Sequence, residues 1–246
     1  MKASVSRLYD RYYPRQPDGV RVADGTKLFY TWLGSIEGIR EAKVLNIGAG
    51  PTPEPRRQLK GKVGRLVGVD IDAVVLANAD LDDAFVTNGV MLPFPDSSFD
   101  VAFSDWTMEH VEYPVRTLRE IRRVLAPGGE FLFRTTNLAH YVTFISSHTP
   151  LWFHRLIANR ARRLTRDEHA PWPTFYRINT RATARRHLAA AGFEMPVIQL
   201  VEPDPAYLAF HPITFRAGIA YERLVNRWAW ASALRLILMA RARVAK

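Results

Sequence analysis

The stretch VLNIGAG, at residues 44–50, decides the fold class of this 246-residue chain. A short apolar run ends there in a glycine turn, where backbone can approach a nucleotide-like ligand without side-chain obstruction. The dinucleotide-binding fingerprint would place a third glycine at position 53, which is Pro53 here. In addition, Pro51, Pro53 and Pro55 have no amide hydrogen to donate to a pyrophosphate. The turn therefore favours a cofactor that lacks phosphate.

Apolar runs alternate with helical patterns along the first 135 residues. Five runs rich in β-branched and aromatic residues predict buried parallel strands at residues 43–48, 65–71, 84–87, 99–104 and 129–135. Between the last two, VRTLREIRRVLAPGG repeats apolar residues at helical spacing and ends in a Pro-Gly-Gly stop. This alternation predicts an α/β fold with a doubly wound, mostly parallel sheet.

The whole chain, 1–246, is expected to form a single domain. In chain order its parts are N-terminal cap helices (1–40), a cofactor-binding core (41–137), a helical lid insertion (138–179) and a C-terminal part (180–246). The lid is inferred because an aromatic and basic segment interrupts the alternation just after a strand, where the ligand crevice of such sheets lies. The C-terminal part predicts a helix at 180–193, a strand at 194–203 and a long closing helix at 216–246.

Asp70 ends the second predicted strand in VGVDID (67–72), 20 residues after Gly50. A carboxylate there can accept hydrogen bonds from both ribose hydroxyls of a nucleoside. The alternative role is the N-cap of the segment AVVLANA, which Asp72 can fill instead. Asp70 is therefore predicted to bind the ribose of the cofactor.

A set of four ordered motifs is completed by TNGVMLPFPDSSFDVAFSDWTMEHV at residues 87–111; the others are VLNIGAG, VGVDID and LREIRRVLAPGGEFLF. Over residues 40–137 the sequence resembles the class I S-adenosylmethionine-dependent methyltransferases, in the subgroup that contains many small-molecule methyltransferases. The resemblance implies a seven-stranded Rossmann-like sheet, S-adenosylmethionine as cofactor and methyl transfer as the reaction.

The resemblance also implies a set of cofactor-binding residues. The glycine turn would pass beneath the methionine and ribose, Asn88 would lie beside the adenine amino group, and Ser104 would face the cofactor from the fourth strand. The full set is Asn46, Gly48, Ala49, Gly50, Asp70, Ile71, Asn88, Gly89, Val90 and Ser104. Asn46 and Asn88 depart from the family pattern, because they replace acidic residues and keep a carbonyl acceptor while losing charge.

The acceptor side of the site is expected at Asp105 and Trp106, where the methyl group would meet its acceptor. Methyl transfer to a hydroxyl also needs a group that removes the hydroxyl proton. His140, just beyond the fifth predicted strand, is the predicted catalytic base and a substrate contact; the other histidines considered are His110, His148, His154 and His169.

Tyr13, Tyr176 and Arg177 complete the predicted substrate contacts. For Tyr13 the alternative is ordinary packing on an N-terminal cap helix. For the segment FYRINT the alternative is an N-cap of the following helix by Asn179 or Thr180. No metal ligand set is predicted.

The net charge of +10 lies entirely in residues 150–246, because residues 1–149 carry 18 basic and 18 acidic side chains. This asymmetry indicates an anionic partner such as an acidic or lipid-linked small-molecule acceptor, a membrane surface or a nucleic acid. A solvated arginine face is the alternative. Tryptophans and arginines in the expected C-terminal helix suit peripheral membrane contact. The alternative is that this helix packs on the sheet or on a second subunit, so an oligomer is possible. Aliphatic stretches between the arginines favour a membrane or an acidic small molecule over nucleic acid.

The chain has no cysteine, which excludes disulfide scaffolds, thiolate zinc sites and a cysteine nucleophile. No apolar run is long enough to span a membrane and no signal-type stretch begins the chain, so a cytoplasmic location is expected. The favoured function is O-methylation of a small or lipid-linked metabolite of natural-product or cell-envelope biosynthesis. The alternatives are an RNA methyltransferase and a non-catalytic module that binds membrane or nucleic acid on the same fold.

Overall fold

A computed structural model describes residues 3–17, 24–148 and 172–246. The chain divides into two compact units, which we treat separately. The core unit comprises residues 28–135, 174–199 and 238–246, and the accessory unit comprises the described residues of 1–27, 136–173 and 200–237.

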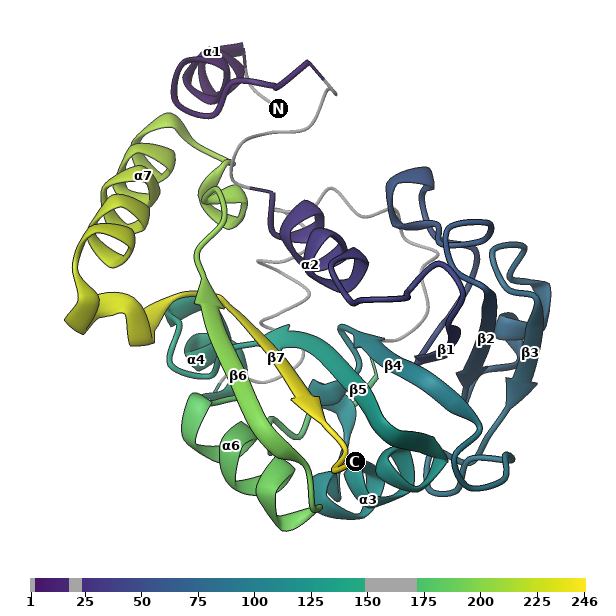
Figure 1. Cartoon of the computed structure of the whole chain (residues 1–246). Helices are drawn as coiled ribbons and strands as arrows, with labels where there is room; N and C mark the ends of the chain where they lie inside the picture. The colour runs from purple at the N-terminus through teal and green to yellow at the C-terminus, as the bar shows by residue number, and fades with distance from the viewer. Residues whose placement is uncertain (1–2, 18–23, 149–171) are drawn as a thin grey trace. The chain divides into compact units, whose positions relative to one another are not determined.

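A seven-stranded sheet organises the core unit, with the strand order β3-β2-β1-β4-β5-β7-β6 (Figure 1). Its strands are β1 (Lys43–Ile47), β2 (Arg65–Asp70), β3 (Asp83–Val86), β4 (Phe99–Asp105), β5 (Leu125–Thr136), β6 (Glu194–Val201) and β7 (Ile237–Arg243). The five strands predicted in the first 135 residues and the strand predicted at 194–203 are confirmed. The predicted seven-stranded, mostly parallel architecture is confirmed as well.

The central strands are buried on both faces, which explains their nearly continuous apolar sequences. Val44 of β1 pairs in parallel with Leu66 of β2 on one side and with Val101 of β4 on the other. All three side chains are buried. Because parallel strands end at the same edge, the residues that follow β1, β2 and β4 are brought together there.

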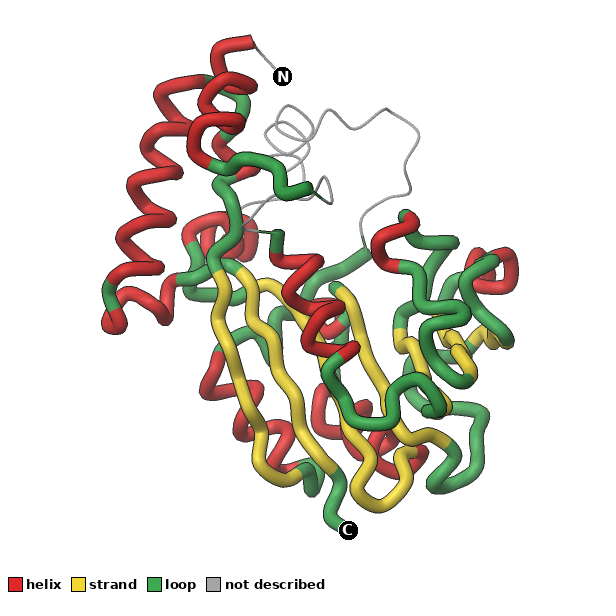
Figure 2. The backbone as a smooth tube through the Cα atoms, turned by 45° about the horizontal axis from the view of Figure 1, so that its top comes forward, coloured by secondary structure: helices red, strands yellow, loops and turns green. Residues whose placement is uncertain are grey.

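Helices cover both faces of the sheet in the core unit (Figure 2). On one face α3 (Pro114–Val124) and α6 (Arg181–Ala190) lie side by side. The helix α3 is the one that the periodicity of VRTLREIRRV predicts. On the other face α2 (Gly25–Gly34) packs through Phe29, whose ring centroid lies 6.5 Å from that of Phe103 in β4. Short 3-10 helices connect these elements at Pro55–Arg57, Ala73–Ala77 and Met108–His110.

The long closing helix predicted for residues 216–246 is wrong. The helix α7 (Pro212–Arg227) is followed by a 3-10 turn at Ala229–Leu234 and then by β7, which lies between β5 and β6 and runs opposite to β6 (Figure 1). Arg241 and Arg243 of β7 both donate to the buried carboxylate of Glu130 in β5. These two arginines therefore share one carboxylate at the β5–β7 pair, and the Arg243 side chain is still 53% exposed. Peripheral membrane contact through this part of the chain stays a prediction.

The accessory unit contains α1 (Ala3–Tyr12), α4 (Tyr141–His148), α7 and a 3-10 turn at Ala206–Leu208. Helix α1 packs on α7 through a cluster of buried residues: Val5, Tyr9, Tyr13, Phe215 and Ile219. Much of the expected lid, residues 149–171 with His154 and His169, lies outside the described residues. Within the described residues, no helix has the length and apolarity needed to cross a membrane.

Candidate active site

The glycine turn after β1 is folded against the end of β2. The amides of Gly48 and Ala49 both donate to the carbonyl of Val69, at 2.9 and 3.0 Å. Gly48 has φ +73°, and a Cβ at this position would lie 2.1 Å from Oγ1 of Thr107, which follows β4. Only glycine meets both requirements, so its backbone can lie close to a ligand and to the end of β4.

Asp70 is held in place by backbone amides on both sides. Its Oδ2 accepts the amide hydrogen of Gly50 at 2.8 Å, and its Oδ1 accepts that of Asp72 at 3.0 Å. Each carboxylate oxygen retains acceptor capacity, as bidentate ribose binding requires. Asp72 is the N-cap of the following 3-10 helix, through the amide of Val74 at 2.9 Å, so the capping role does not fall to Asp70.

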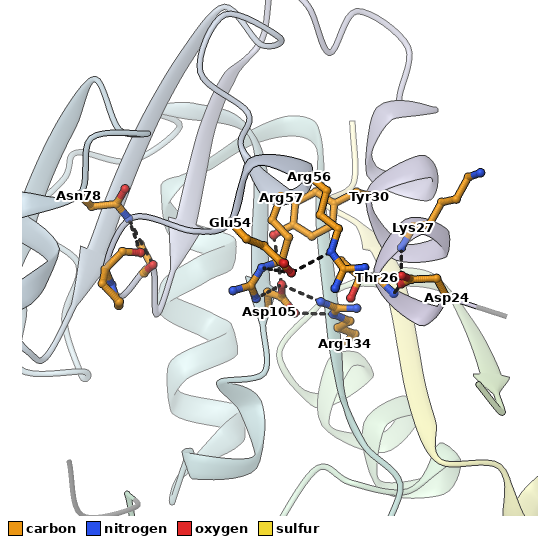
Figure 3. A network of polar contacts seen from close by, with 12 residues as sticks. Asp24, Thr26, Lys27, Tyr30, Glu54, Arg56, Arg57, Asn78, Asp105 and Arg134 are labelled. Carbon is orange, nitrogen blue, oxygen red and sulfur yellow. Dashed lines mark hydrogen bonds and ion pairs between the residues drawn. The ribbon is translucent and has the colours of Figure 1, made fainter. Parts of the chain in front are cut away.

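Asn78 supports the turn from the side and was not anticipated from the sequence. Its buried amide donates to the carbonyls of Gly50 and Pro51, at 3.0 and 3.2 Å (Figure 3). Three prolines nearby leave few amide donors, so a side-chain donor fixes the backbone after the turn. No local pattern signals this role, because the contact joins positions 27 and 28 residues apart.

The adenine side predicted from the sequence is formed by the ends of β2 and β3. Ile71 is 49% exposed and lies against Gly89, where a Cβ would be 3.2 Å from Cγ2 of Ile71. An exposed apolar side chain beside bare backbone suits the face of a flat base. The side-chain oxygen Oδ1 of Asn88 accepts hydrogen bonds from the amides of Val90 and Met91 at 3.0 Å each, so it shapes the loop.

Two buried polar atoms test whether this edge fits S-adenosylmethionine. Oδ1 of Asn46 in β1 and Oγ of Ser104 in β4 have no hydrogen-bond partner among the described residues. Leaving such a group unsatisfied costs about 1–3 kcal/mol, so each calls for a polar partner. The ammonium and hydroxyl donors of S-adenosylmethionine are partners of the right kind, and the residues therefore fit the cofactor.

Asp105, at the end of β4, is bound by a buried ion pair. Nε and Nη2 of Arg134 donate to its two carboxylate oxygens, the second at 2.9 Å, and the hydroxyl of Tyr30 donates to Oδ2 at 3.1 Å (Figure 3). Arg57 approaches the same oxygen at 3.5 Å. Burial and the Asp105 carboxylate raise the pKa of Tyr30 above its ordinary value, so this hydroxyl stays a donor. The cluster gives Asp105 a structural role, and its substrate contact stays a prediction.

Trp106 follows Asp105 in a left-handed backbone conformation, with φ +60°. Its amide donates to the carbonyl of Arg134 at 3.1 Å, and the Arg134 guanidinium lies 5.1 Å from the indole centroid. A non-glycine residue in this region is held there by its surroundings and is typical of functional sites. The position of Trp106 beside the acceptor stays a prediction.

Glu109 is a buried carboxylate that the sequence did not single out, because the motif MEHV draws attention to His110. Its Oε2 accepts the hydroxyl of Thr135 at 2.7 Å, and that hydroxyl accepts the Asn179 amide at 2.8 Å. Burial raises the pKa of Glu109 above its ordinary value. The Asn179 side chain therefore contacts Thr135 inside the core unit, and Thr180 is the residue that caps the N-terminus of α6.

The segment with Tyr176 and Arg177 is fixed to the same short helix. The amides of Phe175 and Tyr176 donate to the carbonyl of Glu109 at 2.9 and 3.2 Å. Tyr176 has φ +52°, a second left-handed residue near the end of β4, and Arg177 is exposed. Their substrate contacts stay predictions.

His140 and Tyr13 belong to the accessory unit, where both have structural partners. The His140 ring is 1% exposed; its Nε2 lies 3.2 Å from Glu202 Oε1, and its Nδ1 accepts the amide of Val142 at 3.2 Å. With both ring nitrogens engaged, His140 has no atom with which to take a substrate proton. Its catalytic role stays a prediction that these surroundings do not favour.

Tyr13 is buried in the α1–α7 cluster, and its hydroxyl donates to Glu222 at 3.2 Å. Burial and Glu222 raise its pKa. These contacts correspond to the packing role that the sequence left as the alternative.

The chain is similar to several known methyltransferases. Residues 45–133 match the family described as a methyltransferase domain. The chain is 36% identical over 142 residues to the ubiquinone/menaquinone biosynthesis C-methyltransferase UbiE of Hahella chejuensis, covering 52% of this chain and 55% of that protein. It is 39% identical over 79 residues to the demethylmenaquinone methyltransferase of Symbiobacterium thermophilum, covering 28% of this chain and 32% of that protein.

Among solved structures, the putative methyltransferase of Haloferax volcanii in complex with the activator Trm112 has a similar fold. Its TM-score is 0.57 at 21% identity, with 88% of each chain covered. Fold and site together define a class I, Rossmann-like methyltransferase fold. Residues 45–133 within it are those that match the methyltransferase domain. The chain spans between a third and just over half the length of the curated relatives named above.

Proposed function

We propose that this protein transfers the methyl group of S-adenosylmethionine to a small-molecule acceptor. The observation that carries the proposal is the Asp70 carboxylate, fixed by the amides of Gly50 and Asp72 at the edge where β1 and β2 end. It lies within the residues that match the methyltransferase domain.

The bound cofactor supplies a methyl carbon activated by positively charged sulfur. Asp70 accepts hydrogen bonds from the ribose hydroxyls, while Ile71 and the loop after Asn88 cover the adenine base. Asn46 and Ser104 accept polar hydrogens of the cofactor from the buried side. Such contacts position the methyl group for an in-line displacement, which is the main task of the protein in this reaction.

The acceptor is proposed to be a small or lipid-linked metabolite, and the sequence favours oxygen as its methylated atom. Relatives named as C-methyltransferases support a small-molecule acceptor and make a carbon acceptor the alternative to an oxygen acceptor. An oxygen acceptor must lose a proton. Glu109 is a buried carboxylate just beyond the end of β4, with Oε2 accepting the Thr135 hydroxyl, and we propose it beside His140 as a second candidate base.

Radiolabelled S-adenosylmethionine, incubated with the protein and a panel of phenols, quinol precursors and RNA, tests the function. Label in a small molecule supports the proposal, and the carbon-13 shift of the new methyl group separates O- from C-methylation. Label in RNA alone would support the RNA alternative. Cofactor binding without transfer to any acceptor in the panel would favour the non-catalytic module.

A further inference from the structure

A pocket on the α3 side of the core unit shares only the loop residue Val90 with the predicted cofactor contacts. It also includes Tyr176 and Arg177, two of the substrate contacts predicted from the sequence. Its volume is about 1240 Å³, and three segments line it: the loop after β3, the α3 region from Glu112 to Arg123, and Phe175–Arg177, together with Arg186 and His187 of α6. Neither the glycine turn nor Asp70 is among its lining residues. All the residues that line it belong to the core unit.

Unpaired arginines converge on this pocket from three different elements. The exposed arginines are Arg116 of α3, Arg177 of the loop before α6 and Arg186 of α6. None of them has a carboxylate partner in the described part of the chain. Arg119 contacts only a backbone carbonyl there, that of Ala190 at 3.4 Å. The surface therefore holds several guanidinium groups whose charges are not neutralised internally.

The carboxylates of the pocket do not balance these arginines. Glu120 is bound by Arg123 at 2.6 Å and by the amide of Leu92 at 2.8 Å, so its charge is used locally. Arg123 also pairs with Asp96 at 2.7 Å. Glu112 is left as the one other acidic lining residue among those described. Planar guanidinium groups that surround one space match the several oxygens of a phosphate group.

Apolar surface lies beside the arginines in the same pocket. Met91 is 65% exposed, Tyr113 63% and Phe175 37%. Nδ1 of His187 is buried without a hydrogen-bond partner among the described residues, so it adds an unsatisfied polar atom. We propose that this pocket binds an organic phosphate: the arginines hold the phosphate, and the exposed apolar side chains cover the hydrocarbon part of the ligand.

Titration calorimetry with octyl phosphate, in the absence of S-adenosylmethionine, tests the proposal independently of methyl transfer. We expect saturable binding that weakens about tenfold or more in Arg116→Gln and in Arg177→Gln, because each removes charge-assisted hydrogen bonds. The matched control is Arg185→Gln, which makes the same charge change at the exposed neighbour of Arg186, outside the pocket lining. Phe175→Ala should weaken octyl phosphate more than inorganic phosphate.

Vesicles distinguish the two sources of an organic phosphate. Displacement of bound octyl phosphate by phosphatidic acid vesicles, but not by phosphatidylcholine vesicles, would assign the pocket to a lipid headgroup. Lack of displacement would assign it to a soluble phosphate ester. Absence of saturable octyl phosphate binding, or equal weakening in Arg185→Gln, would overturn the proposal.

Discussion

Arg134 and Asp105 form a buried, two-pronged ion pair between adjacent strands at the edge of the sheet where the acceptor is expected. They are register partners of β5 and β4, and their side chains are 1% and 8% exposed. The Arg134 guanidinium lies 5.2 Å from the ring centroid of Phe29 and 5.1 Å from that of Trp106. Both charges are therefore removed from water together, and the pair fixes the backbone that leads into Trp106.

Replacing one member of this pair should be costly. Arg134→Leu removes the two-pronged partner of the buried Asp105 carboxylate and leaves it the Tyr30 hydroxyl and the more distant Arg57. We expect a loss of about 3 kcal/mol in the free energy of unfolding measured with urea. Arg65→Leu removes an exposed pair with Asp83 and should cost at most about 1 kcal/mol. An Arg134→Leu variant no less stable than Arg65→Leu would contradict the structural role of the pair.

Gly48 should tolerate no side chain. Gly48→Ala places a Cβ against Thr107, in addition to the strain of φ +73°, and is expected to abolish cofactor binding and to lower the melting temperature. Gly61→Ala is the matched control, because Gly61 has φ +76° and no atom within 4 Å of its added Cβ. The control should lose only about 1–2 kcal/mol. Similar effects of the two substitutions would show that the contact with Thr107 is unimportant.

The stability of the protein should respond to pH through Glu109. Burial raises the pKa of this carboxyl group, so folding favours its protonated form, and stability is lost as pH rises through the ordinary value of about 4.3 toward the folded value. Glu109→Gln should therefore match the wild type near pH 4 and become relatively more stable toward pH 8. Thermal unfolding across this range measures the difference.

Glu130 provides the opposite case for the same experiment. Burial alone would raise its pKa, but hydrogen bonds from Arg241 and Arg243 outweigh burial and lower it. Glu130→Gln should then be less stable than the wild type at pH 7, with the difference shrinking as pH falls toward 3. If both variants showed the same pH trend, the assigned directions of these two pKa shifts would be wrong.

The sequence predicts the strands of the core because buried parallel strands and amphipathic helices have distinct periodicities. It does not predict β7, since ILMARAR continues an apolar run from α7, and a short run of this kind does not by itself separate helix from strand. The deciding partner, Glu130, lies 111 residues from Arg241 in the chain. That distance hides the ion pairs that place the arginines in the sheet.

The candidate site likewise contains residues that the sequence predicts and residues that it does not. Gly48 and Asp70 belong to local motifs whose chemistry can be read directly. Arg134, Glu109 and Asn78 were missed because their roles depend on burial and on partners far away in sequence. The position of His140 just after a strand predicts a catalytic base. Its contacts with Glu202 and Val142, which occupy both ring nitrogens, arise only in the folded accessory unit and cannot be seen in the sequence.

Calorimetric titration of the wild type and Asp70→Ala with S-adenosylmethionine tests the central claim most directly. Loss of the ribose hydrogen bonds, worth about 1.5–3 kcal/mol each, should weaken binding at least tenfold in a folded variant. Asp83→Ala, at the start of β3, removes the same charge outside the predicted cofactor site and should bind like the wild type. Unchanged affinity in folded Asp70→Ala, or no binding by the wild type, would contradict the assignment of this site to S-adenosylmethionine.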